Sequence, residues 1–97
     1  MAGKDRRALL NLNDASLIYA EKRIELTKNE YRILLTLLQS KGKVVSREKL
    51  MQALWETESF VDENTLTVNV GRLRKKLETA GLNDFITTKF GMGYIIS

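Results

Sequence analysis

The sequence predicts a single α+β domain with a small N-terminal antiparallel β-sheet, three helices and a C-terminal β-hairpin. Three observations predict this fold class. Short strand-like segments precede a helix-capping sequence, apolar residues then recur at helical spacing, and a glycine-containing turn separates two short segments near the C-terminus. The chain has 97 residues without a linker-like stretch, which is enough for one domain with one thin hydrophobic core.

Three short segments are expected to form the N-terminal sheet. They cover residues 9–13, 16–20 and 22–26, and turn-forming Asn-Asp and Ala-Glu pairs separate them, as in an antiparallel meander. The preceding segment Met1–Arg7 is polar and basic without periodicity. We interpret residues 1–8 as a linker remnant or tag and residues 9–97 as the folded domain.

Capping residues mark the start of the first two helices. Thr27 and Glu30 form a T-x-x-E capping box, and Gly42 is expected to end the first helix. Ser46 is the expected N-cap of the second helix. The apolar stripe of the first helix is predicted at Tyr31, Leu34, Leu35 and Leu38, and the buried side of the second at Leu50, Ala53, Leu54 and Trp55.

A third helix is predicted within residues 62–80. Leu66, Val70, Leu73 and Leu77 share one face, and Gly81 with Leu82 is typical of a Schellman stop. The opposite face is predicted to carry Thr65, Val68, Gly71, Arg72 and Lys75, flanked by Asn69, Arg74 and Lys76. Residues 85–89 and 94–96 then read as a hairpin around the turn-like segment 90–93.

The composition excludes several classes of function. Without cysteine or histidine, the chain lacks the commonest general base, thiolate chemistry and the commonest transition-metal ligands. No nucleophile has a base at a recognisable spacing, so we expect no enzymatic activity and no cofactor. No apolar run approaches the length of a membrane span, and no signal-peptide pattern opens the chain.

Charge is unevenly distributed. The chain has 16 Lys and Arg against 12 Asp and Glu, a net charge of +4. An acidic segment with Glu56, Glu58, Asp62 and Glu63 runs directly into the basic third helix. The spacing of these acids is unlike an EF-hand, so a metal site is disfavoured, and a loop offered to a protein partner is the better interpretation.

Three helices followed by a hairpin, with a basic third helix, form the outline of a winged helix-turn-helix. Arg72 is suited to guanine and Val68 to a thymine methyl, while Asn69 or Thr65 could bond bases or phosphates. Arg74, Lys75 and Lys76 would supply charge for phosphates. Two alternatives stay open: the basic residues could only keep an amphipathic helix soluble, and Trp55 could pack in the core or reach a phosphate.

Three segments closely resemble one known family. They are LTKNEYRILLTLLQSKGKVVSREKLMQALW (26–55), VDENTLTVNVGRLRKKLE (61–78) and ITTKFGMGYII (86–96). Together the chain resembles the effector domain of OmpR/PhoB-type response regulators from Leu9 to Ser97. The version FVDENTLTVNVGRLRKKL is most similar to the subgroup that answers envelope stress and antimicrobial peptides in Gram-positive bacteria.

The resemblance implies a cytoplasmic transcription regulator of a bacterial two-component system, here without its receiver domain. It implies a third helix in the major groove, a C-terminal wing in the minor groove, and two copies in tandem on direct-repeat half-sites, with a monomer expected for the isolated domain. The loop at 56–64 would contact RNA polymerase. Matching positions imply DNA contacts by Thr65, Asn69, Arg72, Arg74, Trp55 and Thr88. Phe90 replaces the usual wing arginine, so two alternatives stay open: the preceding Lys89 takes over its DNA contact, or Phe90 simply packs.

Two other classes remain to be distinguished from sequence-specific DNA binding. A winged-helix module could bind protein or RNA and use the basic helix only electrostatically. An enzyme would require an unsuspected cofactor. Loss of base preference in an Arg72 variant separates the first of these from direct readout.

Overall fold

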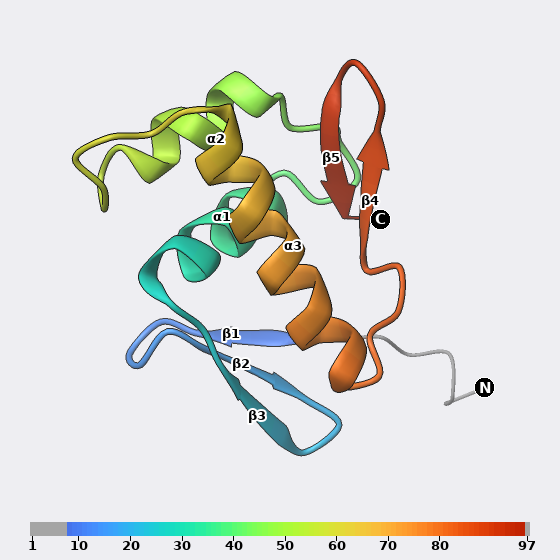
Figure 1. Cartoon of the computed structure of the whole chain (residues 1–97). Coiled ribbons are helices and arrows are strands. Elements are labelled where there is room, and N and C mark those ends of the chain that lie inside the picture. Colours follow the sequence, from blue (N-terminus) through green and yellow to red (C-terminus); the bar gives the residue numbers. More distant parts are fainter. Residues whose placement is uncertain (1–7, 97) are drawn as a thin grey trace.

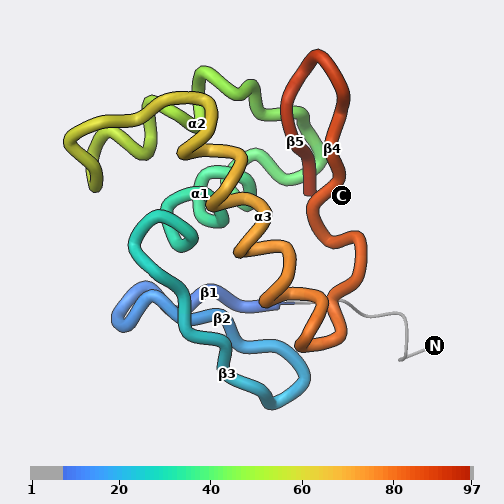
Figure 2. The backbone as a smooth tube through the Cα atoms, in the orientation of Figure 1, coloured from blue at the N-terminus to red at the C-terminus, as the bar shows by residue number. Residues whose placement is uncertain are grey.

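The computed structural model describes residues 8–96, and the predicted α+β order is confirmed (Figure 1). The three-stranded sheet lies at one end of the helices, and the second strand pair stands beside them (Figure 2). Residues 1–7, interpreted above as a linker or tag, lie outside the described part, whereas Ala8 packs partly buried against the core. The elements are β1 (Leu9–Asn11), β2 (Ser16–Tyr19), β3 (Lys22–Glu25), α1 (Lys28–Gln39), α2 (Arg47–Leu54), α3 (Glu63–Thr79), β4 (Ile86–Lys89) and β5 (Gly93–Ile96).

The N-terminal sheet packs one face on the helices. Its strands form an antiparallel meander in the order β1-β2-β3. Leu10 pairs with Leu17, and Leu17 pairs with Ile24, so the three side chains form one row across the sheet. Leu17 is fully buried and the other two pack against the core. The predicted strands are therefore confirmed, each ending one or two residues earlier than expected.

Helix α1 has the predicted capping box but a different buried face. The Thr27 hydroxyl accepts from the Glu30 N–H at 3.1 Å, and the Glu30 carboxylate accepts from the Thr27 N–H at 2.9 Å. The predicted apolar stripe was wrong by about one position. Helices α2 and α3 and strand β5 all contact α1, and the fully buried residues are Ile33, Leu34 and Leu37, whereas Tyr31, Leu35 and Leu38 are only partly buried.

Helix α2 starts at its predicted cap, Ser46, whose hydroxyl accepts from the Lys49 N–H at 3.1 Å. Leu50 and Leu54 are fully buried, as predicted. The prediction that Trp55 lies on the buried side was wrong, because 51% of this C-cap residue is exposed. About half of Trp55 is therefore available to a partner outside the core.

Helix α3 has the face that its spacing predicts. Leu66, Val70, Leu73 and Leu77 are all at most 2% exposed. The helix ends in a Schellman motif, with Leu82 N–H donating to the Leu77 carbonyl at 2.8 Å and Gly81 at a φ of 99°. The predicted orientation and C-terminal stop of the third helix are confirmed.

The β4–β5 hairpin is joined to the α1–α2 connection. Tyr94 and Val45 exchange two backbone hydrogen bonds of 2.8 and 3.0 Å, forming an isolated antiparallel bridge. Gly93 fits against this bridge because it has no Cβ: a Cβ there would lie 2.0 Å from the Val45 carbonyl oxygen. The base of the hairpin is thus fixed to the helical core.

An ion pair between half-exposed Lys76 and buried Glu30 connects α3 to the start of α1. The Lys76 ammonium lies 2.6 Å from the Glu30 carboxylate and also donates to the Glu25 carbonyl oxygen at 2.9 Å. Glu30 is only 1% exposed. The same carboxylate therefore caps α1 and holds α3 against the end of β3.

We predict that Glu30→Ala lowers the free energy of unfolding by about 2–4 kcal/mol, because it removes both the cap acceptor and the partner of Lys76. Glu30→Gln should lose less, since its amide oxygen can still accept from the Thr27 N–H. Urea denaturation measures both. Glu78→Ala is the matched control, because it removes an exposed carboxylate from α3; an equal loss in Glu30→Ala and Glu78→Ala would contradict this role of Glu30.

Candidate nucleic-acid interface

The outward face of α3 carries two cations that make no ion pair with the described residues 8–96. With the leucine and valine stripe buried, Arg72, Lys75 and Val68 project on the other side of the helix, and Val68 is 37% exposed. A Cβ added to Gly71, on the same side, would meet no atom within 4 Å. Internal packing therefore does not require this glycine, and the backbone there is open to a close approach from outside.

Thr65 and Asn69 are engaged in the helix itself. The Thr65 N–H and hydroxyl both donate to the Asp62 carboxylate, at 2.8 and 2.9 Å, which caps α3. These hydrogen bonds hold the pKa of Asp62 below its usual range. The Asn69 amide donates to the Thr65 carbonyl at 2.8 Å, and only 8% of this residue is exposed. The expectation that Asn69 flanks the exposed face was wrong, because it lies beside buried Val70 and its amide folds back.

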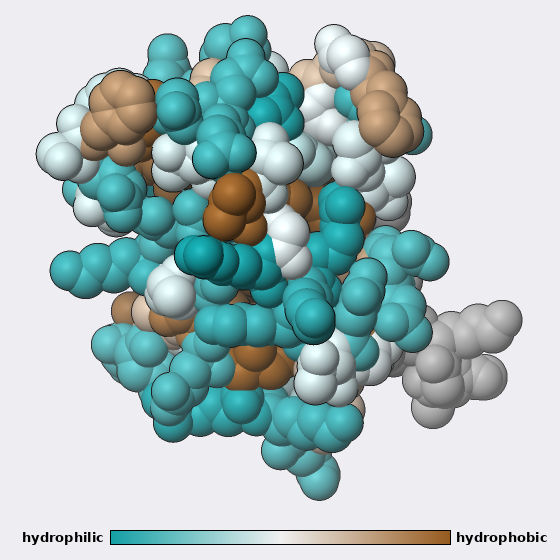
Figure 3. All heavy atoms as spheres, viewed as in Figure 1, coloured by the Kyte–Doolittle hydropathy of each residue, from teal (hydrophilic) through white to brown (hydrophobic). Residues whose placement is uncertain are grey.

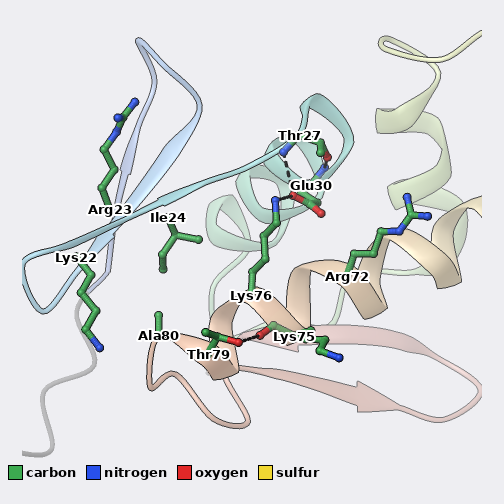
Figure 4. A pocket seen from close by; sticks show the side chains of 10 residues that line it. All are labelled: Lys22, Arg23, Ile24, Thr27, Glu30, Arg72, Lys75, Lys76, Thr79 and Ala80. Carbon is green, nitrogen blue, oxygen red and sulfur yellow. Dashed lines mark hydrogen bonds and ion pairs between the residues drawn. The ribbon is translucent and has the colours of Figure 1, made fainter.

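Two other predicted contact residues bind neighbouring elements. Arg74 donates to the Thr88 hydroxyl at 3.0 Å and so connects α3 to β4. Lys76 reaches the other way, to Glu30 (Figure 4). The cations of α3 are therefore divided between two that connect α3 to other elements and two, Arg72 and Lys75, that project from it.

An open groove of about 650 Å³ runs between β3 and α3. Figure 4 shows Lys76 crossing it, whereas Arg72 and Lys75 point away from Glu30. Lys22 and Arg23 stand on the sheet side of the groove, although Arg23 is paired with Asp14 at 2.6 Å. The sequence analysis missed these two cations, because a strand pattern in the sequence does not indicate that β3 lies across a groove from α3.

The wing presents a basic and an apolar side chain at its tip. Lys89 is the last residue of β4 and is exposed, and Phe90 follows it with 92% of its surface exposed. Thr88 lies closer to the helices, where it accepts the hydrogen bond from Arg74. The structure thus places Thr88 at the point where the wing contacts α3, and Lys89 one residue further toward the tip of the wing.

Arg47 joins α2, α3 and the wing, and sequence reasoning missed it. Its guanidinium donates to the Tyr94 hydroxyl at 2.8 Å, to the Thr67 hydroxyl at 2.9 Å and to Glu63, whose carboxylate lies 3.1 Å from Nε. The guanidinium carbon also lies 5.8 Å from the centre of the Tyr94 ring. This planar group fixes the wing relative to the first turn of α3.

The acids of the α2–α3 connection are bound within the domain. Glu56 pairs with Arg32 at 2.6 Å, Glu58 accepts from the Asn29 amide at 2.9 Å, Asp62 caps α3, and Glu63 pairs with Arg47. All four remain exposed to solvent. Phe60, in the same loop, is 66% exposed. The loop is therefore an acidic and partly aromatic surface with a defined shape.

Neither a metal centre nor a membrane segment was found in the described part of the chain. Residues 8–96 contain no cluster of three or more metal-ligating side chains. None of the helices described has both the length and the hydrophobicity that a transmembrane span needs.

Three helices, an anchored wing and a third helix with a basic outer face define a winged-helix DNA-binding domain. The family model described as "Transcriptional regulatory protein, C terminal" matches residues 21–96. The chain therefore belongs to the OmpR/PhoB-type family of response-regulator C-terminal domains, which are DNA-binding transcription regulators rather than enzymes. The predicted family is confirmed.

Individual relatives agree with this assignment. The sensory transduction protein BceR of Bacillus subtilis (strain 168) is 58% identical over 72 residues, which are 74% of this chain and 31% of BceR. This chain thus spans about a third of that relative. The C-terminal domain of NsrR, a lantibiotic response regulator, superposes with a TM-score of 0.80 at 42% identity, covering 92% of this chain and 90% of that one. The similarity to NsrR agrees with the predicted subgroup.

A second solved structure contains DNA. The DNA-binding domain of response regulator AdeR, in complex with an intercistronic region, superposes with a TM-score of 0.84 at 27% identity over 96% of each chain. The fold of this chain is therefore shared with a domain that has been captured on DNA.

We predict that Arg47→Met lowers the free energy of unfolding by about 1–3 kcal/mol, because four hydrogen bonds to α3 and β5 are lost and the Tyr94 hydroxyl is left unpaired. Amide hydrogen exchange at Tyr94 should also become faster. Lys49→Met is the matched control, since it removes one exposed cation from the same helix. Equal unfolding midpoints for the two variants would show that Arg47 does not hold the wing.

Proposed function

We propose that this chain binds double-stranded DNA sequence-specifically, as the output domain of a two-component response regulator. Helix α3 would lie in the major groove, which admits a helix, and the β4–β5 wing would reach the adjacent minor groove. The observation that carries this proposal is the pair of cations on α3, Arg72 and Lys75, that have no ion-pair partner among residues 8–96. The same helix contacts the wing through the Arg74–Thr88 hydrogen bond, and the wing is fixed to the core.

We assign roles to the α3 side chains according to whether they are bound by hydrogen bonds within the domain. Arg72 is suited to a bidentate contact with guanine, and Val68 to the methyl group of thymine. Lys75 would neutralise a phosphate without reading the base. Asn69 and Lys76 would have to leave internal hydrogen bonds to reach DNA, so we assign them a smaller share of the affinity than the sequence alone indicated.

Residues around α3 would position the duplex. Trp55 is half exposed at the end of α2, where its indole N–H can donate to a phosphate. Thr65 at the start of α3, and Arg74 and Thr88 where α3 meets β4, are the next candidates, with Lys89 at the wing. The RNA polymerase contact would be the α2–α3 loop, with Glu56, Glu58, Asp62 and Glu63.

The assembly is proposed by analogy with the family. Two copies would bind direct-repeat half-sites as a tandem dimer, whereas the isolated domain would be a monomer. In a full-length regulator a receiver domain would control this binding, in the cytoplasm. Similarity to NsrR favours a regulator that answers antimicrobial peptides.

The rival hypothesis is a winged-helix module that binds protein or RNA through general electrostatics. Selection from a randomised duplex pool separates the two, with binding measured by fluorescence anisotropy at about 50 and 200 mM salt. Enrichment of a direct repeat spaced by one helical turn, about 10–11 bp, supports the proposal. Binding that collapses with salt and enriches no sequence would refute it.

On the selected duplex, we predict that Arg72→Ala weakens binding by about 1–3 kcal/mol and relaxes base preference at one position, because a bidentate base contact is lost. Lys75→Ala should weaken binding to all sequences about equally and reduce the salt dependence. Titrations against the selected duplex and a scrambled one measure both effects. If the two variants behave alike on both duplexes, α3 does not read bases directly.

A further prediction concerns the α2–α3 loop. Replacing Glu56 and Glu58 by Gln and Asp62 by Asn removes three negative charges, while the asparagine amide oxygen can still cap α3. DNA affinity should stay equal or rise slightly, since like charge near phosphates is removed. Transcription in vitro from a promoter with the selected site should fall. Full transcription by the triple variant would argue against a polymerase contact here.

A further inference from the structure

The tip of the wing is the most exposed apolar part of the domain described. Phe90 is 92% exposed and Met92 is 61% exposed. Figure 3 shows a hydrophobic patch at this tip, at the upper right, while most of the visible face is hydrophilic. Covering an exposed phenyl ring with a binding partner removes apolar surface from water and so lowers the free energy. The tip is therefore a candidate contact surface that the positively charged face of α3 does not explain.

The tip has a rigid support. The Met92 N–H donates to the Lys89 carbonyl at 2.9 Å, and Gly91 has a φ of 76°, which together define a tight turn with Phe90 at its second position. A Cβ at Gly91 would meet nothing within 4 Å, so the turn stands clear of the rest of the domain. Two backbone hydrogen bonds between Tyr94 and Val45 fix the base. Phe90 thus sits at the end of a fixed arm.

The charge around the tip favours a polyanion as its partner. A notch of about 230 Å³ separates the wing from the helices, and its lining includes Lys89, two threonines and Arg47, whose guanidinium is paired with Glu63. Lys89 directly precedes Phe90. Duplex DNA combines a phosphate backbone that suits such a notch with stacked apolar bases that suit a phenyl ring.

We infer that Phe90, with Met92 beside it at the tip, enters the minor groove, inserts as an apolar wedge between adjacent base pairs and bends the DNA. Phenylalanine and methionine side chains inserted in this way partly unstack a base step and kink the duplex toward the major groove. A phenyl ring has no hydrogen-bonding group for base edges, so the wing would select steps that unstack easily, such as TA or CA. This inference rests on the proposed DNA binding and adds bending to it.

The test uses the 97-residue chain and the duplex selected above, labelled at both ends for energy transfer and carrying 2-aminopurine at the step facing the wing. The wild-type chain should shorten the end-to-end distance and raise the 2-aminopurine fluorescence. Phe90→Ala should lose both signals and bind about 3- to 30-fold more weakly. Its salt dependence should not change, because no charge is removed.

Two variants make the test specific. Phe60→Ala is the matched control, because it removes another exposed phenyl ring, on the α2–α3 loop, and should leave bending intact. Phe90→Arg should recover affinity with a steeper salt dependence while the bend stays lost. Urea denaturation should give equal midpoints for wild type and Phe90→Ala, since the ring makes little contact with the fold.

Three outcomes would overturn the wedge. Specific binding without bending leaves the proposed function intact and removes only this inference. A bend that persists in Phe90→Ala also removes it. Binding of the wild-type chain to phosphatidylglycerol vesicles that is lost in Phe90→Ala, with DNA bending unchanged, would assign the tip to a lipid surface. Absence of any sequence-specific binding would instead refute the proposed function itself.

Discussion

The ion pair between Glu30 and Lys76 is the contact on which the arrangement of this domain depends. Glu30 caps the first helix through the Thr27 N–H, and its carboxylate also holds the ammonium of Lys76, which in turn donates to the last residue of β3. One carboxylate thus connects the sheet, α1 and α3. Because Glu30 is buried, removal of Lys76 would leave a costly unpaired carboxylate, whereas the ammonium of Lys76 is partly exposed to solvent.

That contact also determines what α3 presents to its surroundings. Lys76 holds one side of the helix against the sheet, and Arg74 holds the other side against the wing through Thr88. The residues between these two sides, including Arg72 and Lys75, are left to project outward. Two lysines and two arginines within five positions therefore have different tasks, and their positions around the helix decide which task each one has.

Much of the fold could be predicted because its signals are local. The capping box at Thr27 and the stop after Leu77 depend on residues three to five positions apart, and both are confirmed. Lys76 is 46 positions from Glu30, and the partners of Arg47 are 16, 20 and 47 positions away, so no local sequence pattern indicates these contacts. The exposure of Trp55 was missed for a similar reason. Helical periodicity predicts which face of a helix is buried, but not how far along the helix the neighbouring elements cover that face. For the candidate site, the sequence predicted a third helix with four cations, which the structure has, but it could not tell the cations bound to other elements from those that project outward.

Because Gly93 fits against Val45, the stability of the wing depends on residues at its base and not on the exposed side chains at its tip. The bridge and the missing Cβ hold the base of the hairpin, whereas Phe90 and Met92 contribute little to the core. Substitutions of Phe90 or Met92 therefore cost almost nothing in folding. After a gene duplication, the tip of one copy could therefore change by drift, while selection for a folded protein continued to act on the glycine beneath it.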